Sequence, residues 1–199
     1  REHTKHMIRL RHAGQINGTE AKEIILLNSH DGSSSYQMLA GVFRFVCHNG
    51  LVCGDTVADI RIPHKGNVTE RVIEGAFEVL DQFDNVENHM DAMKSVTLNA
   101  LEKRIFADAA LALRYDEKDG PAPIAASQLL EARRFEDRKD DLWTTFNRVQ
   151  ENIIRGGLSA RTKQGKSTRT RAVTGMDKDT SLNRALWILS ERMNELKAA

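Results

Sequence analysis

The chain has little of what marks a secreted, membrane-spanning or disulfide-rich protein. Its 199 residues include only two cysteines, Cys47 and Cys53, which is typical of a protein kept reduced in the cytoplasm. Apolar runs such as Ile24–Leu27 fall far short of the roughly 20 residues that a membrane-spanning helix needs. No basic segment followed by an apolar one opens the chain. It begins at Arg1 rather than at methionine, so we expect a fragment or a trimmed chain, and a leader upstream stays open.

The chain also lacks the residue spacings of common metal and nucleotide sites. Cys47 and Cys53 are not a C-x-x-C pair, and only His48 offers a second ligand type beside them. Adjacent strand residues point to opposite faces, so Cys47 and His48 are poorly placed to share one ion. The triplet Gly165–Ser167 lacks the upstream glycine and the preceding strand of a phosphate-binding loop. We therefore expect no metal and no cofactor.

The composition is that of a folded α+β protein. Hydrophobic residues make up 40% of the chain and charged residues 29%, which suits one substantial core. We expect a single domain over residues 1–199, in which a sheet precedes the helices. Its predicted parts are a β-sheet (1–65), a helical part (66–154), a basic loop (155–176) and a C-terminal amphipathic helix (177–199).

Two patterns in the first 65 residues favour strands. Met7–Arg11 alternates apolar and basic side chains, whereas Glu23–Asn28 and Tyr36–Cys47 are β-branched runs. The Asn49-Gly50 pair favours a tight turn, and an antiparallel meander is the simplest sheet that these segments can form. Gly41, inside one strand, predicts a bulge or a close approach of another backbone. The predicted strands are Met7–Arg11, Glu23–Asn28, Tyr36–Cys47, Leu51–Cys53 and Val57–Ile62.

From Thr69 the apolar residues follow the three-four spacing of helices. Thr69–Leu113 contains no proline, so it predicts either one long helix or two helices hinged near Asp84–Asn88. Asn67 or Thr69 can cap its start. Further helices are predicted over Ser127–Phe135, Lys139–Ile154 and Thr180–Lys197, with Gly156-Gly157 ending the second of these.

Charge is distributed very unevenly along the chain although its net value is only +1. Residues 66–154 hold 11 Lys/Arg against 18 Asp/Glu, whereas residues 155–175 hold six Lys/Arg and no acid. A purely basic segment beside an acidic body is expected where a loop meets an anionic partner. The alternative is a mobile, solvated loop that carries positive charge without a partner.

The basic segment supplies the main candidates for nucleic-acid binding. Basic side chains that alternate with small polar ones can follow a phosphate backbone without reading bases. We expect Arg44 and neighbouring strand residues to form the floor of the same groove, and Tyr36 to stack on an unpaired base. In the competing interpretation the strand arginines pair with Glu23 or Asp59. The candidates within the basic segment are Arg161, Lys163, Lys166, Arg169 and Arg171.

Two polar islands lie between the predicted strands, at Asn28–Tyr36 and Phe43–Leu51. They place reactive and turn-forming side chains close together, which ordinary cores do not require. No known catalytic spacing emerges from them, and a lone strand cysteine is usually a small buried hydrophobe. A hydrolase-type enzyme centred on His30, Asp31 and Cys47 stays open as an alternative. The polar residues of unknown role are His30, Asp31, Ser33, Cys47 and Asn49.

The islands belong to a longer series of motifs that resembles a known family. The series consists of NSHDGSSSY, YQMLAGVFRFVCHNGLVCGD, RVIEGAFEVL and TGMDKDTSLNRALWILSERMNEL. In this order they resemble the phage/plasmid-like family with the domain of unknown function 932, from His6 to Leu196. The resemblance implies a bacterial protein of prophages, phages or conjugative plasmids that works in the cytoplasm. The resemblance implies no catalytic residues, because the family has no established activity.

The order of elements is also similar to the β-β-β-α core of the single-strand annealing superfamily, a likeness of fold alone. Our first hypothesis is a non-enzymatic nucleic-acid-binding protein, a single-stranded DNA binder or annealer that forms homo-oligomers. The second is an anti-defence protein that binds a host effector through the same surface. The third is the hydrolase-type enzyme. None of the three involves a membrane.

Overall fold

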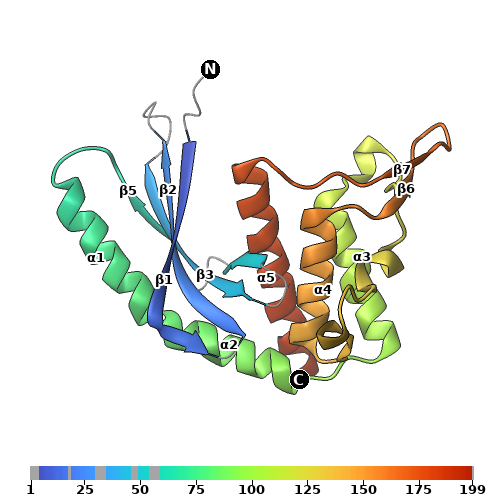
Figure 1. The fold of residues 1–199 in the computed structure, drawn as a ribbon, viewed down its shortest axis with the longest axis horizontal. Coiled ribbons are helices and arrows are strands. Elements are labelled where there is room, and N and C mark those ends of the chain that lie inside the picture. The colour runs from blue at the N-terminus through green and yellow to red at the C-terminus, as the bar shows by residue number, and fades with distance from the viewer. Residues whose placement is uncertain (1–4, 18, 30–34, 46–48, 54–58, 199) are drawn as a thin grey trace. The chain divides into compact units, whose positions relative to one another are not determined.

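A computed structural model of the protein describes residues 5–17, 19–29, 35–45, 49–53 and 59–198 (Figure 1). The chain forms two compact units, Arg1–Asn88 and His89–Ala199. Strands occupy the N-terminal part and helices follow, so the predicted α+β class is confirmed. The single domain over 1–199 stays a prediction.

The first unit carries a five-stranded antiparallel sheet. The strands β1 to β4 follow one another as the predicted meander, and β5 returns to pair with the other half of β3. The central strand β3 ends at Arg44, so it is shorter than predicted. The strands are β1 (Lys5–Asn17), β2 (Glu20–Ser29), β3 (Tyr36–Arg44), β4 (Asn49–Val52) and β5 (Asp59–Ile62).

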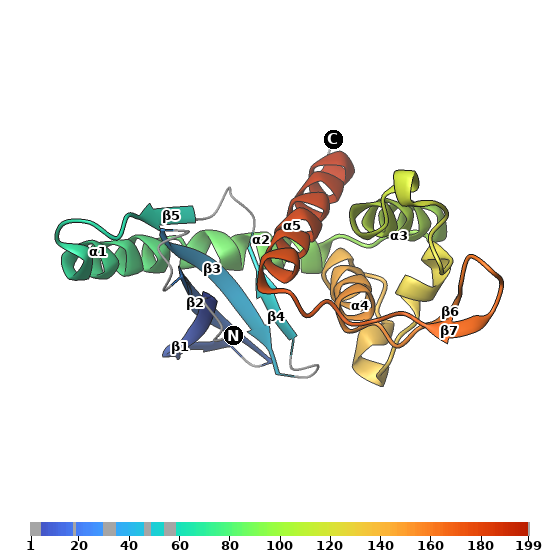
Figure 2. The same cartoon turned by 90° about the horizontal axis from the view of Figure 1, so that it is seen from above.

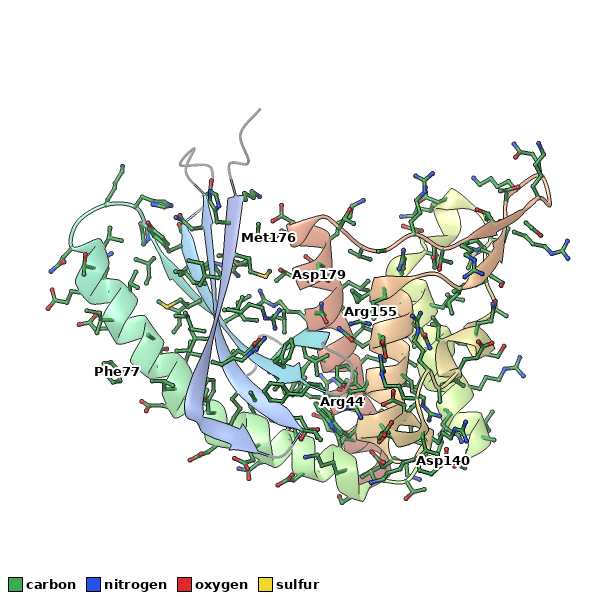
Figure 3. All side chains as sticks on the ribbon, in the orientation of Figure 1. Arg44, Phe77, Asp140, Arg155, Met176 and Asp179 are labelled. Carbon is green, nitrogen blue, oxygen red and sulfur yellow. The ribbon has the colours of Figure 1, made fainter. Side chains whose placement is uncertain are left out.

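The helix α1 (Val68–Asp81) packs against the sheet. It begins at the predicted cap, because the Asn67 side chain accepts a hydrogen bond from the Glu70 backbone N–H at 3.4 Å. Gly75 and Val79 are buried towards the sheet, whereas Phe77 is 63% exposed and projects away from the helix (Figure 3). The close approach predicted at Gly41 is present: a Cβ there would lie 2.9 Å from the Leu51 carbonyl oxygen.

The predicted helical block is divided into three helices rather than one or two. After α1 come α2 (Phe83–Ser95) and α3 (Ala100–Arg114), so the expected hinge at Asp84–Asn88 lies inside α2. The second break falls before α3, where Asn99 and Glu102 form a reciprocal capping box that favours a new helix start. Side chains that bond their own backbone therefore set this break.

The second unit is a helical assembly around α4 (Leu142–Arg155) (Figure 2). The residues of α4 from Leu142 to Ile153 are all buried. This helix packs against α5 (Met176–Ala198), α3 and two of the three short 3-10 helices, η2 and η3. The helix predicted over Ser127–Phe135 is wrong. The 3-10 helices are η1 (Glu117–Asp119), η2 (Ala126–Leu130) and η3 (Phe135–Arg138).

The failure of that helix has an identifiable cause in α4. The Asn152 side chain donates to the carbonyls of Leu129 and Glu131 at 3.0 and 2.9 Å, so these carbonyls bond to α4 rather than to a following helical turn. Other polar groups of α4 are also paired: Glu151 binds Arg134 through both carboxylate oxygens, at 2.7 and 2.5 Å. The polar interior therefore ties the irregular segment to α4.

Candidate nucleic-acid interface

The basic segment predicted as a loop contains a two-stranded hairpin. Its strands β6 (Ser159–Arg161) and β7 (Ser167–Arg169) pair antiparallel, with Arg161 opposite Ser167 and Ser159 opposite Arg169. The Gly165 N–H donates to the Thr162 carbonyl at 2.8 Å, and Gly165 has a φ of +78°. Glycine suits this left-handed position, because other residues are strained there.

The base of the hairpin is held where α4 ends. Gly156 ends α4 with a φ of +64°, and a Cβ at this position would lie 2.7 Å from the Arg171 backbone carbonyl. The Gly157 N–H donates to the Thr170 carbonyl at 2.8 Å, and the Thr170 hydroxyl accepts from the Leu158 N–H at 3.1 Å. The predicted glycine pair thus ends the helix and permits the returning strand to approach closely.

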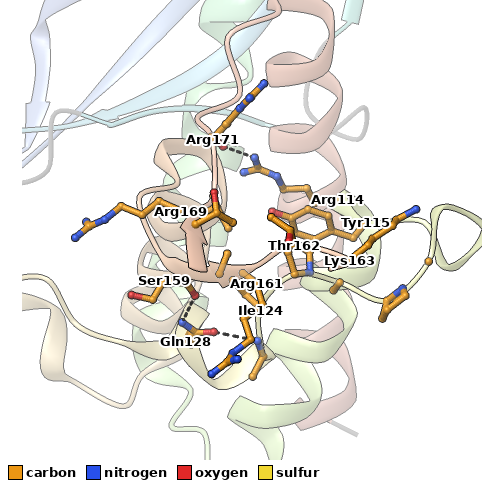
Figure 4. A pocket seen from close by; sticks show the side chains of 18 of the residues that line it. Arg114, Tyr115, Ile124, Gln128, Ser159, Arg161, Thr162, Lys163, Arg169 and Arg171 are labelled. Carbon is orange, nitrogen blue, oxygen red and sulfur yellow. Dashed lines mark hydrogen bonds between the residues drawn. The ribbon is translucent and has the colours of Figure 1, made fainter. Parts of the chain in front are cut away.

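A second attachment joins the hairpin to the segment before η2. The Gln128 side chain donates to the Ser159 carbonyl at 2.9 Å and accepts from the Ala125 N–H at 3.0 Å (Figure 4). The Arg161 N–H donates to the Pro123 carbonyl at 3.1 Å. Gln128 therefore bridges the hairpin and the segment before η2, and a space lies between these two parts of the chain.

That space is a cavity of about 1010 Å³, which we call the hairpin groove. One wall is the hairpin, and the other is the chain from Arg114 to Ala125. The labelled basic side chains fan out around the groove rather than converge on one point (Figure 4). Two carboxylates, Asp116 and Asp119, also line it. The basic residues that line it are Arg114, Arg161, Lys163, Arg169 and Arg171.

The cations of the hairpin are not neutralised by the part of the chain that the structure describes. Among the described residues, no carboxylate forms an ion pair with any of the five predicted basic residues, and all five are exposed. Arg169 instead donates to the Gly157 carbonyl at 3.3 Å. Lys166 lies beside the turn at Gly165 and does not line the groove. Four of the five predicted residues are therefore brought together: Arg161, Lys163, Arg169 and Arg171.

Sequence analysis missed Arg114 and Tyr115, which line the same groove. Arg114 lies in the last turn of α3 and donates to the Arg171 backbone carbonyl. Its guanidinium carbon is 5.3 Å from the centre of the Tyr115 ring, within the range of a cation–π contact. An arginine in the last turn of a helix also suits the helix dipole, so the sequence offers no signal that separates this position from an ordinary one.

The other two predicted binding residues belong to the first unit, whereas the hairpin groove is built wholly from the second. Arg44 is only 6% exposed. The Tyr36 ring is 4.4 Å from the ring of His64, centre to centre. The contributions expected of these two residues stay predictions.

Four of the island residues, His30, Asp31, Ser33 and Cys47, lie outside the described residues. Asn49 begins β4, where it pairs with Arg44, and Gly50 pairs with Phe43, so the turn predicted at Asn49-Gly50 is wrong. The hydrolase-type interpretation and the role of these residues stay untested.

The described part of the second island supports a buried charge cluster in the sheet. Glu23 is fully buried, and its two carboxylate oxygens accept from Arg9 at 2.6 Å and from Arg11 at 2.7 Å. The Arg11 guanidinium lies 3.6 Å from the centre of the Phe43 ring. A Cβ at Gly50 would lie 2.6 Å from the Arg9 guanidinium nitrogens, so glycine leaves the room that Arg9 occupies. The pairing of strand arginines with Glu23 is confirmed for Arg9 and Arg11.

Two other kinds of site are absent from the described residues. No helix in that part of the chain is both long and apolar enough to cross a bilayer. Nor do three or more histidine, cysteine, aspartate or glutamate side chains gather there in a way that would hold a metal ion.

Comparison with known proteins places the chain in a family. The model of a family described as a domain of unknown function (DUF932) matches residues 1–187, which include the whole hairpin groove. The chain is 55% identical over 193 residues to the UPF0380 protein YafZ of Escherichia coli (strain K12), covering 97% of this chain and 70% of that protein. The UPF0380 protein YfjQ of the same organism gives the same identity and coverage. No solved structure matches. The chain therefore belongs to the DUF932 family, as the motifs between His6 and Leu196 predict.

Proposed function

We propose that the protein binds single-stranded nucleic acid, without catalysing a reaction, as part of a mobile genetic element in the bacterial cytoplasm. One observation carries the proposal. A groove of about 1010 Å³ is lined by five basic side chains, and none of them forms an ion pair with a carboxylate of the described residues. Exposed cations held in a concave surface attract phosphate, because the surrounding protein focuses their field.

The spread of the cations favours a polymer over a small anion. Arg161 pairs with Ser167, which is two residues from Arg169. Arg161 and Arg169 are therefore diagonal neighbours on one face of the hairpin. Such neighbours are about 7–8 Å apart. Lys163 and Arg171 extend in other directions (Figure 4). One phosphate can contact only part of this set, whereas consecutive phosphates of a strand can contact all of it.

An aromatic ring in the groove favours a single strand over a duplex. Tyr115 lines the groove and is partly exposed, and the Arg114 guanidinium lies near its ring. A ring in this position can stack on a base only when that base is accessible, as it is in single-stranded nucleic acid. Asp116 and Asp119, on the same wall, would repel a second phosphate backbone.

A charge-matched pair of variants tests the proposal. The groove variant Arg161→Ser, Arg169→Ser, Arg171→Ser loses three cations of the hairpin groove. The control Lys65→Ser, Arg71→Ser, Arg192→Ser loses three exposed cations elsewhere and has the same net charge. By fluorescence anisotropy with a labelled oligothymidine, we expect the groove variant to bind about 100-fold more weakly and the control within about threefold of the wild type.

Equal losses in both variants would show that net charge alone drives binding, and the groove assignment would then be wrong. Absence of binding by the wild type, together with retention of one host protein in stoichiometric amount on the immobilised wild type, would support the anti-defence interpretation. Duplex DNA of the same length, used as a competitor, separates single-strand preference from general affinity for phosphate.

A further inference from the structure

The outer face of α3 carries a stripe of three apolar residues and one aspartate that no part of the described second unit covers. Its members, Leu101, Ile105, Asp108 and Ala112, follow a four-three-four spacing and are exposed. Leu101 is 66% exposed and Ile105 is 52% exposed. This spacing is that of the contact line of a two-stranded coiled coil. We call this set the α3 stripe.

The stripe is complementary to itself when two copies meet antiparallel. In that arrangement a two-fold axis near the middle of the stripe places Leu101 against Ala112 of the partner subunit. The same axis places Ile105 against the partner's Asp108 and beside the partner's Ala109, which is half-buried in its own chain. Large side chains thus oppose small ones, which allows the helices to approach closely and interdigitate. A parallel pair would instead place Leu101 against Leu101 and Ala112 against Ala112.

The charges on the stripe fit the same arrangement. Arg104 and Asp108 are 3.8 Å apart on one helix, with side chains that are 76% and 59% exposed. In the antiparallel pair each Asp108 lies near Arg104 of the partner subunit, so both charges gain a second partner of opposite sign. A protein with an unrelated surface would need its own matching base and acid, whereas a second copy of this chain supplies both.

We propose that the α3 stripe is a self-association surface through which two copies of the protein pair antiparallel. A single helix pair buries less than the roughly 1,000 Å² of a stable interface, so the association is weak and is expected in the micromolar range. The second copy is the occupant to which the packing and the charges both point.

The pairing has a consequence for binding, and this step alone rests on the proposed function. Each α3 ends at Arg114, beside a hairpin groove. Antiparallel pairing puts the two Arg114 residues at opposite ends of the helix pair, about 22 Å apart along its axis for 15 residues at about 1.5 Å each. A strand long enough to reach both grooves would bind more tightly than a short one.

Sedimentation equilibrium of the protein alone tests the pairing. We expect the wild type to approach the dimer mass at about 100 μM and Ile105→Glu to stay monomeric. Phe77→Glu, an equivalent exchange at an exposed residue of α1, should behave as the wild type. Circular dichroism checks that each variant is folded. A monomeric wild type at this concentration, or a dimeric Ile105→Glu, overturns the proposal whether or not the protein binds DNA.

Charge reversal provides a second test that does not depend on the apolar exchange. Arg104→Glu and Asp108→Arg should each be monomeric, because each variant places like charges opposite one another. Their equimolar mixture should dimerise, because every cross-pair is then again opposite in sign. A mixture that associates no more than either variant alone contradicts antiparallel pairing through this surface. If pairing holds but strand length does not affect affinity, the proposed function is in question rather than the interface.

Discussion

Arginines of the two units illustrate two different uses of the same side chain. In the sheet, Arg9 and Arg11 are bound to the buried carboxylate of Glu23, at 2.6 and 2.7 Å. In the hairpin, Arg161 and Arg169 are exposed and have no carboxylate partner among the described residues. The first pair stabilises the protein, and the second is available to a ligand. An arginine is therefore a binding candidate according to its partners rather than its position on a strand.

The largest effect is expected where the sheet arginines lose their partner. Glu23→Gln removes the negative charge that Arg9 and Arg11 both bind and leaves their guanidinium groups near each other. We expect a loss of about 3 kcal/mol in the free energy of unfolding, at the low end for broken buried pairs because Arg11 is 41% exposed. Urea denaturation measures it. At a temperature where the variant is folded, its affinity for oligothymidine should not change. A large drop in affinity would contradict the distinction between the sheet arginines and the hairpin arginines.

A smaller effect, on affinity for oligothymidine, is expected when Arg114 at the end of α3 is replaced. Arg114→Ala removes a cation that lines the hairpin groove and a hydrogen bond to the Arg171 carbonyl. We expect affinity for oligothymidine to fall about tenfold, which corresponds to one charge-assisted hydrogen bond. Arg104→Ala changes an arginine of the same helix that does not line the groove, and it serves as the control when binding is measured with short oligonucleotides. Equal affinity of both variants would place Arg114 outside the interface.

The attachment of the hairpin should affect affinity for oligothymidine less than the charge of the hairpin does. Gln128→Ala breaks the bridge between the Ser159 carbonyl and the Ala125 N–H without altering any cation. We expect a two- to fivefold loss of affinity, about 1 kcal/mol at most, because the hairpin keeps its attachment at Gly157. A loss as large as that of the groove variant would mean that the bridge, rather than the charge, governs binding.

The smallest effect concerns acid stability of the second unit. The Asn99 backbone N–H and the Lys197 ammonium lower the pKa of Glu102 from its ordinary 4.5, and Lys103 lowers the pKa of Asp140 from 3.8. A depressed pKa contributes stability that is complete above the ordinary value and is lost as pH falls through the lower, folded value. The midpoint temperature should therefore decline below about pH 4.5. Asp140 is exposed and Glu102 is partly exposed, so Glu102→Gln should flatten that decline only slightly. A steeper decline in the variant would contradict this account.

Sequence reasoning succeeded where local patterns decide the structure. The succession of strand-like segments predicted the meander, Asn67 predicted the start of α1, and Gly156 predicted the end of α4. It failed at Ser127–Phe135, because Asn152 of another helix binds the carbonyls of this segment. No local pattern carries that information.

The candidate site was predictable to a similar degree. The excess of basic residues between Arg155 and Gly175 marked the hairpin, since charge is visible in sequence. Arg114 was not found, because it lies some 50 residues earlier and only the fold brings it to Arg171. Nor could the sequence distinguish Arg9 from Arg161, since their partners depend on strand register.

The salt dependence of oligothymidine binding tests the central claim most directly, because each phosphate neutralised by a cation contributes to the slope. For five groove cations the plot of log affinity against log salt should have a slope of about −3.5, and the Arg161, Arg169, Arg171 variant should reduce it to about −1.4. A slope that is near zero in the wild type, or unchanged in the variant, would contradict phosphate binding by the hairpin groove.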